Sequence, residues 1–494
     1  MKNTIVEGLI LSIAQISSKI LSLFFIFYLA SKAKSLGLYL YSYAYIPFSL
    51  FLDLSAFGII PGISKSVALL NSEYKNQNTH YLLKSGTVFS IILGISFYFI
   101  VNIFKSFILK ATLYDGYTYL EYDIILNNLS IASLSILIFP LLSFYKGYMQ
   151  GHMRMLPSAL SILLEAFTRL SLLLLLGNNT NPLYFEKVFI INFVSYLVGL
   201  LVMLIFVFKD YFNKGRCFHS IIYILKRMIP FGMATLFFTI YQLIDSITLN
   251  QQSSYIYTSY MFEATRLIYL PIVACKAIGA VLTPKINYLY KNKDDDSTNS
   301  LARAITNNSI IFLVIVFYLF FHNGEYIYNL FYGNGAFSIL RNSSILILFI
   351  GLYIVMIGLS QGMPKFEYII IVAIISSISK YALNILMIPY YGYIGSIIGT
   401  ISALSICILF SYYLLYKGGI RIFMENVKAM LISIISLAVS IYFSILINFF
   451  FINKIPFINK EILFSGFIFL FYILIISFVR LIRVSKNKYL HINK

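Results

Sequence analysis

Long apolar stretches recur from one end of the 494-residue chain to the other, and this feature constrains the fold most. Each stretch is roughly 20 residues long, enough for a helix to cross ~30 Å of hydrocarbon at about 1.5 Å per residue. Only 11% of the residues are charged, whereas soluble proteins average about 25%. The sequence therefore predicts an all-α, polytopic membrane protein. Its fourteen predicted spans lie near residues 5–30, 37–60, 82–109, 123–148, 158–177, 186–208, 221–249, 255–282, 302–322, 340–362, 366–389, 393–416, 427–452 and 461–482.

The net charge of +19 is unevenly distributed over the connections between these spans. If both termini are cytoplasmic, the termini and even-numbered connections, with the adjoining span ends, hold 24 of the 37 Lys and Arg residues. The odd-numbered connections hold 8. Short cytoplasmic loops carry such an excess of positive charge. We therefore expect an N-in, C-in topology, with basic loops facing anionic membrane lipids and not nucleic acid.

The motifs of several enzyme classes are missing from the sequence. Its three cysteines, Cys217, Cys275 and Cys407, form no CxxC pair, and its five histidines lack metal-ligand spacing. The phosphate-loop pattern GxxxxGK[ST] does not occur. We therefore expect no metal, no nucleotide and no catalytic cofactor, and a transporter or a scaffold in place of an enzyme.

Two stretches of the sequence resemble one another. "YMQGHMRMLPSALSILLEAFTRL" (148–170) and "LSQGMPKFEYIIIVAIISSISKY" (359–381) each begin with Gln-Gly and a Pro-containing basic turn. In each, a cation follows 19 residues after the Gln, Arg169 in the first and Lys380 in the second. Chance similarity between apolar helices is the alternative, but duplicated halves around a midplane site are a common transporter plan. The predicted parts are an N-lobe (1–215), a C-lobe (216–420), and a last helix pair with a basic tail (421–494).

Charged residues inside the predicted spans are the candidate functional residues. Each costs at least ~2.5–3.5 kcal/mol at the centre of a spanning helix, and lipid offers no partner. Glu165 and Arg169 are four residues apart, and Glu263 and Arg266 three apart, so each pair shares a helix face. The nine are Lys19, Asp53, Glu165, Arg169, Asp245, Glu263, Arg266, Lys276 and Lys380.

A polar cavity that collects these residues would suit a diphosphate, because Arg offers a bidentate fork and Lys a mobile point charge. The substrate-binding candidates are Arg169, Arg266, Lys19, Lys380 and Glu165. The candidates for counter-ions, or for ligands of a coupling Na⁺ or H⁺, are Asp245, Glu263 and Asp53. A static ion pair between Glu165 and Arg169 is the structural alternative, and Lys276 is expected to reach the headgroups.

Helix-breaking residues suggest where the lobes could bend. The gating candidates are Gly58, Pro61 and Pro271, because Gly and Pro interrupt helices and let them bend as domains rock. An ordinary helix terminus explains Pro61 equally well.

Three segments carry a resemblance to a known family. "GLYLYSYAYIPFSLFLDLSAFGIIPGISKSVALLNSEYKNQNTHYLLKSG" (37–86), "KGYMQGHMRMLPSALSILLEAFTR" (146–169) and "GYIGSIIGT" (392–400) resemble the MOP exporter superfamily. The branch they resemble contains MurJ-type lipid II flippases, stage V sporulation protein B and YtgP-like proteins. The resemblance implies two six-helix lobes in a V, a cationic central cavity, and a groove for an undecaprenyl tail formed by the last two helices. It also implies a bacterial cytoplasmic membrane location.

The resemblance implies a flippase for lipid II, driven by the membrane potential or an ion gradient. Another lipid-linked polysaccharide repeat unit, or a scaffold for cell-wall enzymes, remains an alternative. The expected partners are the lipid-linked sugar and membrane lipids, with cell-wall synthases as further partners of a monomer. One departure stands out, because Ile26 occupies a position where this branch typically has an arginine, seven residues after Lys19.

Overall fold

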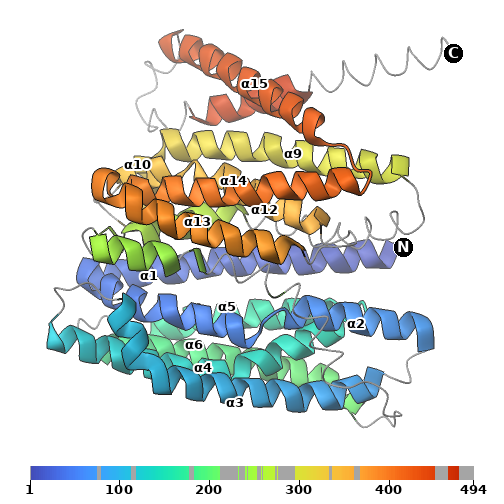
Figure 1. Ribbon diagram of the computed structural model, residues 1–494, viewed down its shortest axis with the longest axis vertical. Helices are drawn as coiled ribbons and strands as arrows, with labels where there is room; N and C mark the ends of the chain where they lie inside the picture. Colours follow the sequence, from blue (N-terminus) through green and yellow to red (C-terminus); the bar gives the residue numbers. More distant parts are fainter. Residues whose placement is uncertain are drawn as a thin grey trace. The chain divides into compact units, whose positions relative to one another are not determined.

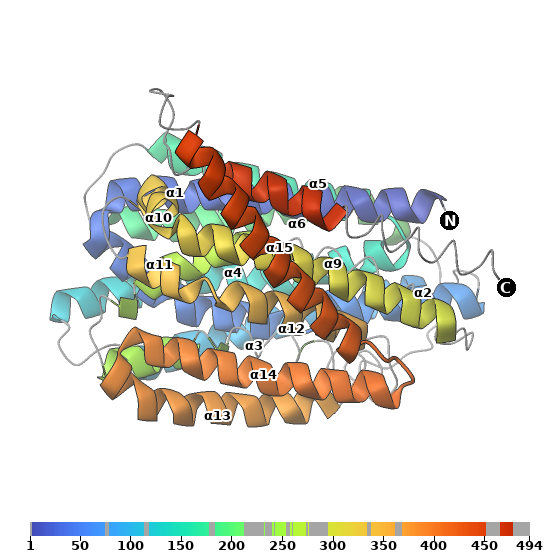
Figure 2. The same cartoon turned by 90° about the horizontal axis from the view of Figure 1, so that it is seen from above.

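The computed structural model describes most of the chain, and all regular secondary structure in the described residues is helical, as predicted. These residues are 2–74, 79–112, 118–176, 183–211, 232, 240–241, 243–252, 257–258, 260–272, 275, 295–332, 337–360, 368–450 and 465–477. The first helices are α1 (Lys2–Ser55), α2 (Ile59–Tyr74), α3 (Thr79–Thr112), α4 (Tyr119–Gly151), α5 (Leu156–Leu176) and α6 (Leu183–Tyr211). The later ones, labelled in Figures 1 and 2, are α9 (Asp295–His322), α10 (Gly324–Tyr332), α11 (Phe337–Ser343), α12 (Leu346–Ser360), α13 (Tyr368–Tyr391), α14 (Tyr393–Lys417) and α15 (Phe423–Phe450).

The described residues contain 9 helices that are long and apolar enough to cross a membrane. A tenth span results if α11 and α12, which meet at a bend of 42°, are taken together. Two shorter apolar helices, Ile13–Leu29 and Ser465–Ser477, fall within the first and last predicted spans. In the predicted span 221–249, 19 of the 29 residues lie outside the described residues, as do 12 of the 28 in the span 255–282. The count of fourteen and the N-in, C-in orientation therefore stay predictions.

The first two predicted spans belong to one element. Helical structure continues through residues 31–36 of α1, where the distribution of charge predicted a loop. The segment "SKAKSL" contains no Gly or Pro, so it has no residue that interrupts a helix. The predicted break at Gly58 is present, because α1 ends at Ser55 and α2 begins at Ile59. Gly58 has φ of 61°, a left-handed conformation that glycine adopts at little cost.

The larger of two compact units comprises residues 1–277 and 364–410. Within it, α4 packs against α2, α3 and α6, and α5 packs against α1 and α6. The start of α5 is held by α1, because the Glu7 carboxylate accepts hydrogen bonds from the backbone N–H groups of Met155 (2.7 Å) and Leu156 (3.3 Å). A carboxylate at a helix N-terminus satisfies free N–H groups and complements the helix dipole. This contact fixes where α5 enters the unit.

Local sequence also explains where α4 begins. Thr118 and Glu121 form a capping box: the Thr118 hydroxyl accepts from the Glu121 N–H (3.3 Å), and the Glu121 carboxylate accepts from the Thr118 N–H (2.9 Å). From there α4 continues to Gly151, and its C-terminal part, including Lys146, is buried.

Helices α13 and α14 form a hairpin and lie side by side in Figures 1 and 2. Gly392, with φ of 56°, is the single residue between them. The returning helix approaches closely, since a Cβ atom on Gly395 would lie 2.7 Å from the backbone nitrogen of Ile388. The hairpin thus places residues near 396–400 of α14 beside residues near 380–388 of α13.

The smaller unit comprises residues 278–363 and 411–494. In it, α9 packs against α12 and α15, and α10 and α11 pack on one another (Figure 2). Asn426 of α15 links two helices: its carbonyl oxygen accepts from the Thr306 hydroxyl of α9 (2.7 Å), and its amide donates to the Tyr412 hydroxyl of α14 (2.7 Å). Buried polar side chains here pair with one another, as lipid-embedded helices require.

Candidate functional site

The Glu165 carboxylate of α5 is paired with Lys146, which lies at the end of the predicted span 123–148 and was counted with the cytoplasmic connection that follows it. Lys146 of α4 donates from Nζ to Oε1 of Glu165 at 2.7 Å, and both residues are buried. The Ser161 hydroxyl donates to the same oxygen, also at 2.7 Å. The pair is therefore an interhelical contact between α4 and α5. The alternative of a static ion pair between Glu165 and Arg169 is not among the salt bridges of the described residues, although Glu165 still acts electrostatically on Arg169.

A glycine on the neighbouring helix makes room for this carboxylate. A Cβ atom on Gly199 of α6 would lie 2.3 Å from Oε1 of Glu165, well inside van der Waals contact. The Ser161 hydroxyl also contacts the carbonyl oxygen of Gly199 at 3.1 Å. The Lys146–Glu165 pair is thus enclosed by α4, α5 and α6, and it functions as a packing contact of three helices.

Arg169 is left without a carboxylate partner among the salt bridges of the described residues. Its guanidinium carbon lies 5.3 Å from the centre of the Tyr196 ring, and a terminal nitrogen lies 3.5 Å from the Ser195 hydroxyl. Its Nε is buried and has no hydrogen-bond partner in the described part of the chain. A half-buried guanidinium with free donor capacity can accept an anionic ligand.

Arg266 has a similar aromatic environment. It lies within the helical residues 260–272, and its guanidinium carbon is 4.5 Å from the centre of the Tyr45 ring and 4.7 Å from that of Phe262. Cation–π contacts of this kind orient a guanidinium over the ring faces. Both predicted arginines are therefore positioned by aromatic rings.

Tyr41 and Tyr45 bring the two arginines into one site. Both tyrosines interact electrostatically with both Arg169 and Arg266. The Tyr41 ring stacks on Tyr45 (5.4 Å between centroids) and on Phe189 of α6 (5.1 Å). We call Arg169, Arg266, Tyr41, Tyr45 and Tyr196 the arginine–tyrosine site. It combines two delocalised cations with phenolic rings, a combination suited to phosphate oxygens.

Lys380 and Asp245 form a second charged cluster in the same unit. Lys380 of α13 is 0% exposed, and its Nζ donates to Oδ2 of Asp245 at 2.8 Å. Nζ also donates to the Thr400 hydroxyl of α14. The two predicted residues, Lys380 and Asp245, are therefore brought together as an ion pair.

The remaining predicted residues are scattered. On α1 and α2, Lys19, Asp53 and Pro61 are exposed, and Asp53 is within electrostatic range of Tyr45. Glu263 is buried, and Pro271 is half-buried within residues 260–272. Pro61 is the third residue of α2, in the first turn, where proline is tolerated. Lys276 lies outside the described residues.

Several residues that contact the predicted site residues were not predicted from the sequence. Lys146 was counted with the loop because it lies two residues from the end of a predicted span. Tyr41, Tyr45 and Tyr196 were not singled out, because the chain contains 41 Tyr residues. Asn384 had a usable signal, because it lies one helical turn after Lys380, on the same face.

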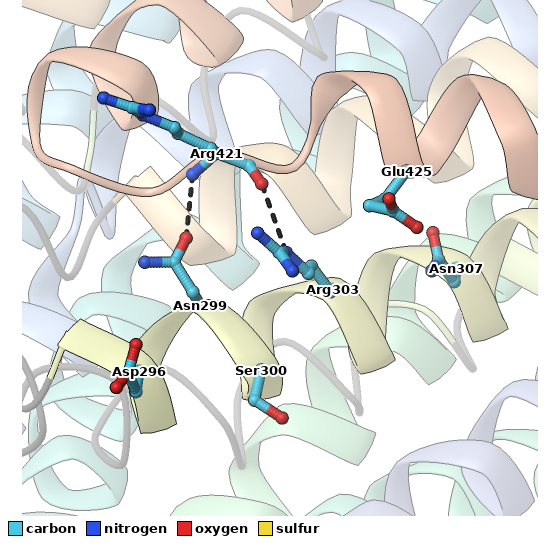
Figure 3. Close-up of a pocket in the computed structure, with 7 residues that line it drawn as sticks. All are labelled: Asp296, Asn299, Ser300, Arg303, Asn307, Arg421 and Glu425. Carbon is cyan, nitrogen blue, oxygen red and sulfur yellow. Dashed lines mark hydrogen bonds between the residues drawn. The ribbon is translucent and has the colours of Figure 1, made fainter. Parts of the chain in front are cut away.

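The smaller unit contains a polar pocket of about 490 Å³, shown in Figure 3. Its base is the link between α9 and the connection after α14, where Asn299 accepts from the Arg421 N–H (2.8 Å) and Arg303 donates to the Arg421 carbonyl (3.2 Å). In Figure 3 the Arg421 side chain extends away from this link. The pocket is lined by Asp296, Asn299, Ser300, Arg303, Asn307, Arg421 and Glu425. None of the predicted site residues is among them.

Metal-binding side chains do not gather anywhere in the described residues, since no group of three His, Cys, Asp or Glu side chains is placed to hold an ion. Cys275 and Cys407 are buried thiols, and the Cys407 thiol donates to the Ser376 hydroxyl at 3.2 Å.

Comparisons with known proteins agree with this organisation. The family model described as polysaccharide biosynthesis protein matches residues 5–286. The lipid II flippase MurJ of Bacillus subtilis (strain 168) is 24% identical over 460 residues, covering 83% of this chain and 81% of MurJ. The uncharacterized membrane protein YabM of the same organism is 25% identical over 465 residues, covering 87% and 82%.

Solved structures show the same fold. MurJ in an inward closed conformation superposes with a TM-score of 0.70 at 18% identity, covering 96% of this chain and 100% of that one. A multidrug resistance MATE family transporter of the MOP superfamily, in an inward-facing conformation, gives 0.68 at 14% identity, covering 82% and 98%. The relatives with a stated activity are transporters, and none is named as an enzyme. The chain therefore belongs to the polysaccharide biosynthesis protein family, as a multi-pass bacterial membrane transporter, and it is similar to MurJ and to a transporter of the MOP superfamily.

Proposed function

We propose that this transporter is a flippase that moves lipid II, an undecaprenyl-pyrophosphate-linked peptidoglycan precursor, from the inner to the outer leaflet by alternating access. Membership of a polysaccharide biosynthesis family and similarity to a MurJ lipid II flippase support a lipid-linked saccharide precursor as the substrate class. The choice of lipid II within that class rests on the MurJ relative and on the charge of the site.

The observation that carries the proposal is the arginine–tyrosine site. Arg169 and Arg266 are each half-buried, contact aromatic rings, and lie within electrostatic range of the same pair of tyrosines. A pyrophosphate offers oxygens to two guanidinium forks at once, and each such charge-assisted contact is about twice as strong as a neutral hydrogen bond. The Tyr41 and Tyr45 hydroxyls supply further donors near the same place. The lipid tail and the sugars would then lie outside the charged centre.

The driving force of the proposed cycle is the membrane potential or an ion gradient. The sequence contains no phosphate-loop motif with which this chain could itself bind ATP. A negatively charged head group moving outward follows the direction that an inside-negative potential favours, at ~2.3 kcal/mol per elementary charge per 100 mV.

A different lipid-linked polysaccharide repeat unit is the second candidate, and one position favours it. Ile26 is buried, 4% exposed, where the MurJ-type branch typically has an arginine. One fewer cation would suit a head group with less negative charge. Lipid II carries a peptide carboxylate in addition to its pyrophosphate, so the missing arginine bears directly on the choice of substrate.

The test is complementation in a bacterium depleted of its own lipid II flippase, with lipid II exposure on the outer leaflet measured directly. We expect the wild-type chain to restore growth and exposure. Arg169→Ala and Arg266→Ala should each abolish both while the protein still reaches the membrane. Arg154→Ala is the matched control, because Arg154 belongs to the same unit but its side chain is 61% exposed and outside the site.

The outcomes separate the candidates. If the protein reaches the membrane but lipid II stays inside, the substrate is wrong, and the same assay with other undecaprenyl-linked glycans tests the second candidate. If the arginine variants retain full activity, the arginine–tyrosine site does not bind the head group. A scaffold for cell-wall enzymes would support growth without lipid II exposure and would tolerate both arginine variants.

A further inference from the structure

The Lys380 cluster contains more oxygen atoms than a simple ion pair requires. Nζ of Lys380 lies 2.8 Å from Oδ2 of Asp245 and donates also to the Thr400 hydroxyl. Asn384 extends the cluster, because its amide nitrogen donates to Oδ1 of Asp245 (3.0 Å) and to the Thr248 hydroxyl (2.9 Å). The Asp245 carboxylate thus connects Lys380 and the Thr400 hydroxyl on one side with Asn384 and the Thr248 hydroxyl on the other.

These four side chains are the ligand types that hard cations prefer in proteins. We call Asp245, Thr248, Asn384 and Thr400 the oxygen cage. The carbonyl oxygen of Asn384 is buried and has no hydrogen-bond partner among the described residues. Gly399 of α14 leaves it space, since a Cβ atom there would lie 2.1 Å from it. The Asn384 carbonyl oxygen is therefore an acceptor that the described residues leave unused.

The position of that positive charge is occupied by the lysine. Lys380 is 0% exposed, whereas the Asp245 side chain retains 19% exposure, so the ammonium is enclosed and the carboxylate is not. The Tyr241 ring faces the ammonium, with its centre 5.5 Å from Nζ. A buried ammonium needs a paired anion and hydrogen-bond acceptors, and the oxygen cage provides both.

The charge balance of the cage leaves no place for a second cation. Asp245 is its single carboxylate and Lys380 compensates that charge in full. An alkali ion entering the cage would have to meet a positive charge at hydrogen-bond distance from the carboxylate it needs. Displacing the lysine would leave an ammonium buried without a partner, which is strongly unfavourable.

We propose that the Lys380 ammonium is a built-in cation that occupies an oxygen cage otherwise suited to Na⁺, so that this cage does not bind a mobile coupling ion. The consequence for transport rests on the proposed flippase function: a Na⁺ gradient cannot drive the cycle through this cage. The occupancy of the cage itself is independent of the substrate and can be measured without it.

The first experiment follows thermal unfolding of the purified full-length protein in NaCl and in choline chloride at equal ionic strength. The wild-type protein should unfold at the same temperature in both salts. In Lys380→Ala, which removes the ammonium and keeps the four oxygens, the unfolding temperature should fall in choline and rise with Na⁺ in a saturable way. Addition of Asp245→Asn to Lys380→Ala should remove this response to Na⁺.

Either of two results would overturn the inference. The first is stabilisation of the wild-type protein by Na⁺ that Asp245→Asn removes, because the cage would then bind a mobile ion. The second is a folded Lys380→Ala protein with no response to Na⁺, because the four oxygens would then not form a cation site. If Lys380→Ala does not fold, Lys380→Gln fills most of the volume and tests the same gain of Na⁺ response.

The wild-type arm needs no variant, and its result is separable from the proposed function. A chain that failed to expose lipid II but unfolded at one temperature in both salts would contradict the flippase proposal alone. A chain that exposed lipid II and was stabilised by Na⁺ through Asp245 would contradict this inference alone.

Discussion

Arg169 on α5 and Lys380 on α13 follow the same Gln-Gly signature at the same spacing, yet the two cations have different surroundings. Lys380 is fully buried, and its ammonium is bonded to a carboxylate and a hydroxyl. Arg169 is half-buried, lies beside the Tyr196 ring, and has a buried Nε without a partner in the described residues. One cation is paired with a carboxylate, and the other has no carboxylate partner among the salt bridges of the described residues.

The two cations have different surroundings because the carboxylate nearest to each has a different partner. Glu165, one turn before Arg169, is taken by Lys146 of α4 at 2.7 Å. Asp245 has no such competitor among the salt bridges of the described residues, and it pairs with Lys380. A cation in a predicted span can therefore be assigned a binding role only after the partner of the neighbouring carboxylate is known.

Both clusters depend on a glycine of the adjoining helix. Gly199 on α6 leaves room for the Glu165 carboxylate, and Gly399 on α14 leaves room for the Asn384 amide. In each case a methyl group would overlap a polar oxygen. Close helix approach at small residues is typical of membrane proteins.

Breaking the Lys146–Glu165 ion pair should have the largest effect on stability. Lys146→Met leaves Glu165 buried without a counter-charge, and removal of one partner of a buried ion pair costs about 3–5 kcal/mol. We expect a correspondingly lower stability of the purified protein in thermal or denaturant unfolding.

The control is the double variant Lys146→Met with Glu165→Met, which replaces the whole pair by apolar side chains. Such replacements are often neutral, so the double variant should regain most of the stability lost in Lys146→Met. Equal losses in the single and double variants would show that the charge pairing is not what stabilises the contact of α4, α5 and α6.

Substitution of the two glycines should have the next largest effect on stability. Gly199→Ala and Gly399→Ala should each destabilise by about 1–3 kcal/mol, the usual cost of overpacking. Gly199→Ala should cost more, because the Glu165 oxygen it displaces holds two bonds of 2.7 Å, whereas the Asn384 oxygen has none in the described residues. Unfolding measurements of both variants decide the order. Gly466→Ala is the control with no expected loss, since a Cβ atom there meets nothing within 4 Å.

The smallest expected effect concerns the ring that positions Arg169. Tyr196→Leu removes a cation–π contact worth about 0.5–1 kcal/mol at a partly exposed site, so outer-leaflet exposure of the substrate should fall by about 2–5-fold. Tyr196→Phe keeps the ring and should retain most of the activity. A Phe variant as impaired as the Leu variant would mean that the hydroxyl, and not the ring face, orients Arg169.

Several features could be predicted from the sequence because they depend on local pattern. Apolar stretches of spanning length predicted helices, and Gly58 predicted the break between α1 and α2. The high cost of charge in lipid identified Arg169, Arg266, Asp245 and Lys380 as residues that need a polar partner or a ligand. The loop predicted at residues 31–36 failed for the same kind of reason, because charge suggested a loop where the local residues permit a helix.

The sequence by itself determined that this is a helical membrane protein and which charges in it need a partner, because hydrophobicity and insertion cost are properties of single segments. Only the tertiary structure decided which charges meet. Lys146 and Glu165 lie on different helices, and Asp245 and Lys380 are 135 residues apart, so packing alone brings each pair within 2.8 Å. Since that packing pairs Glu165 with Lys146 and Asp245 with Lys380, it leaves Arg169 without a carboxylate partner among the salt bridges of the described residues.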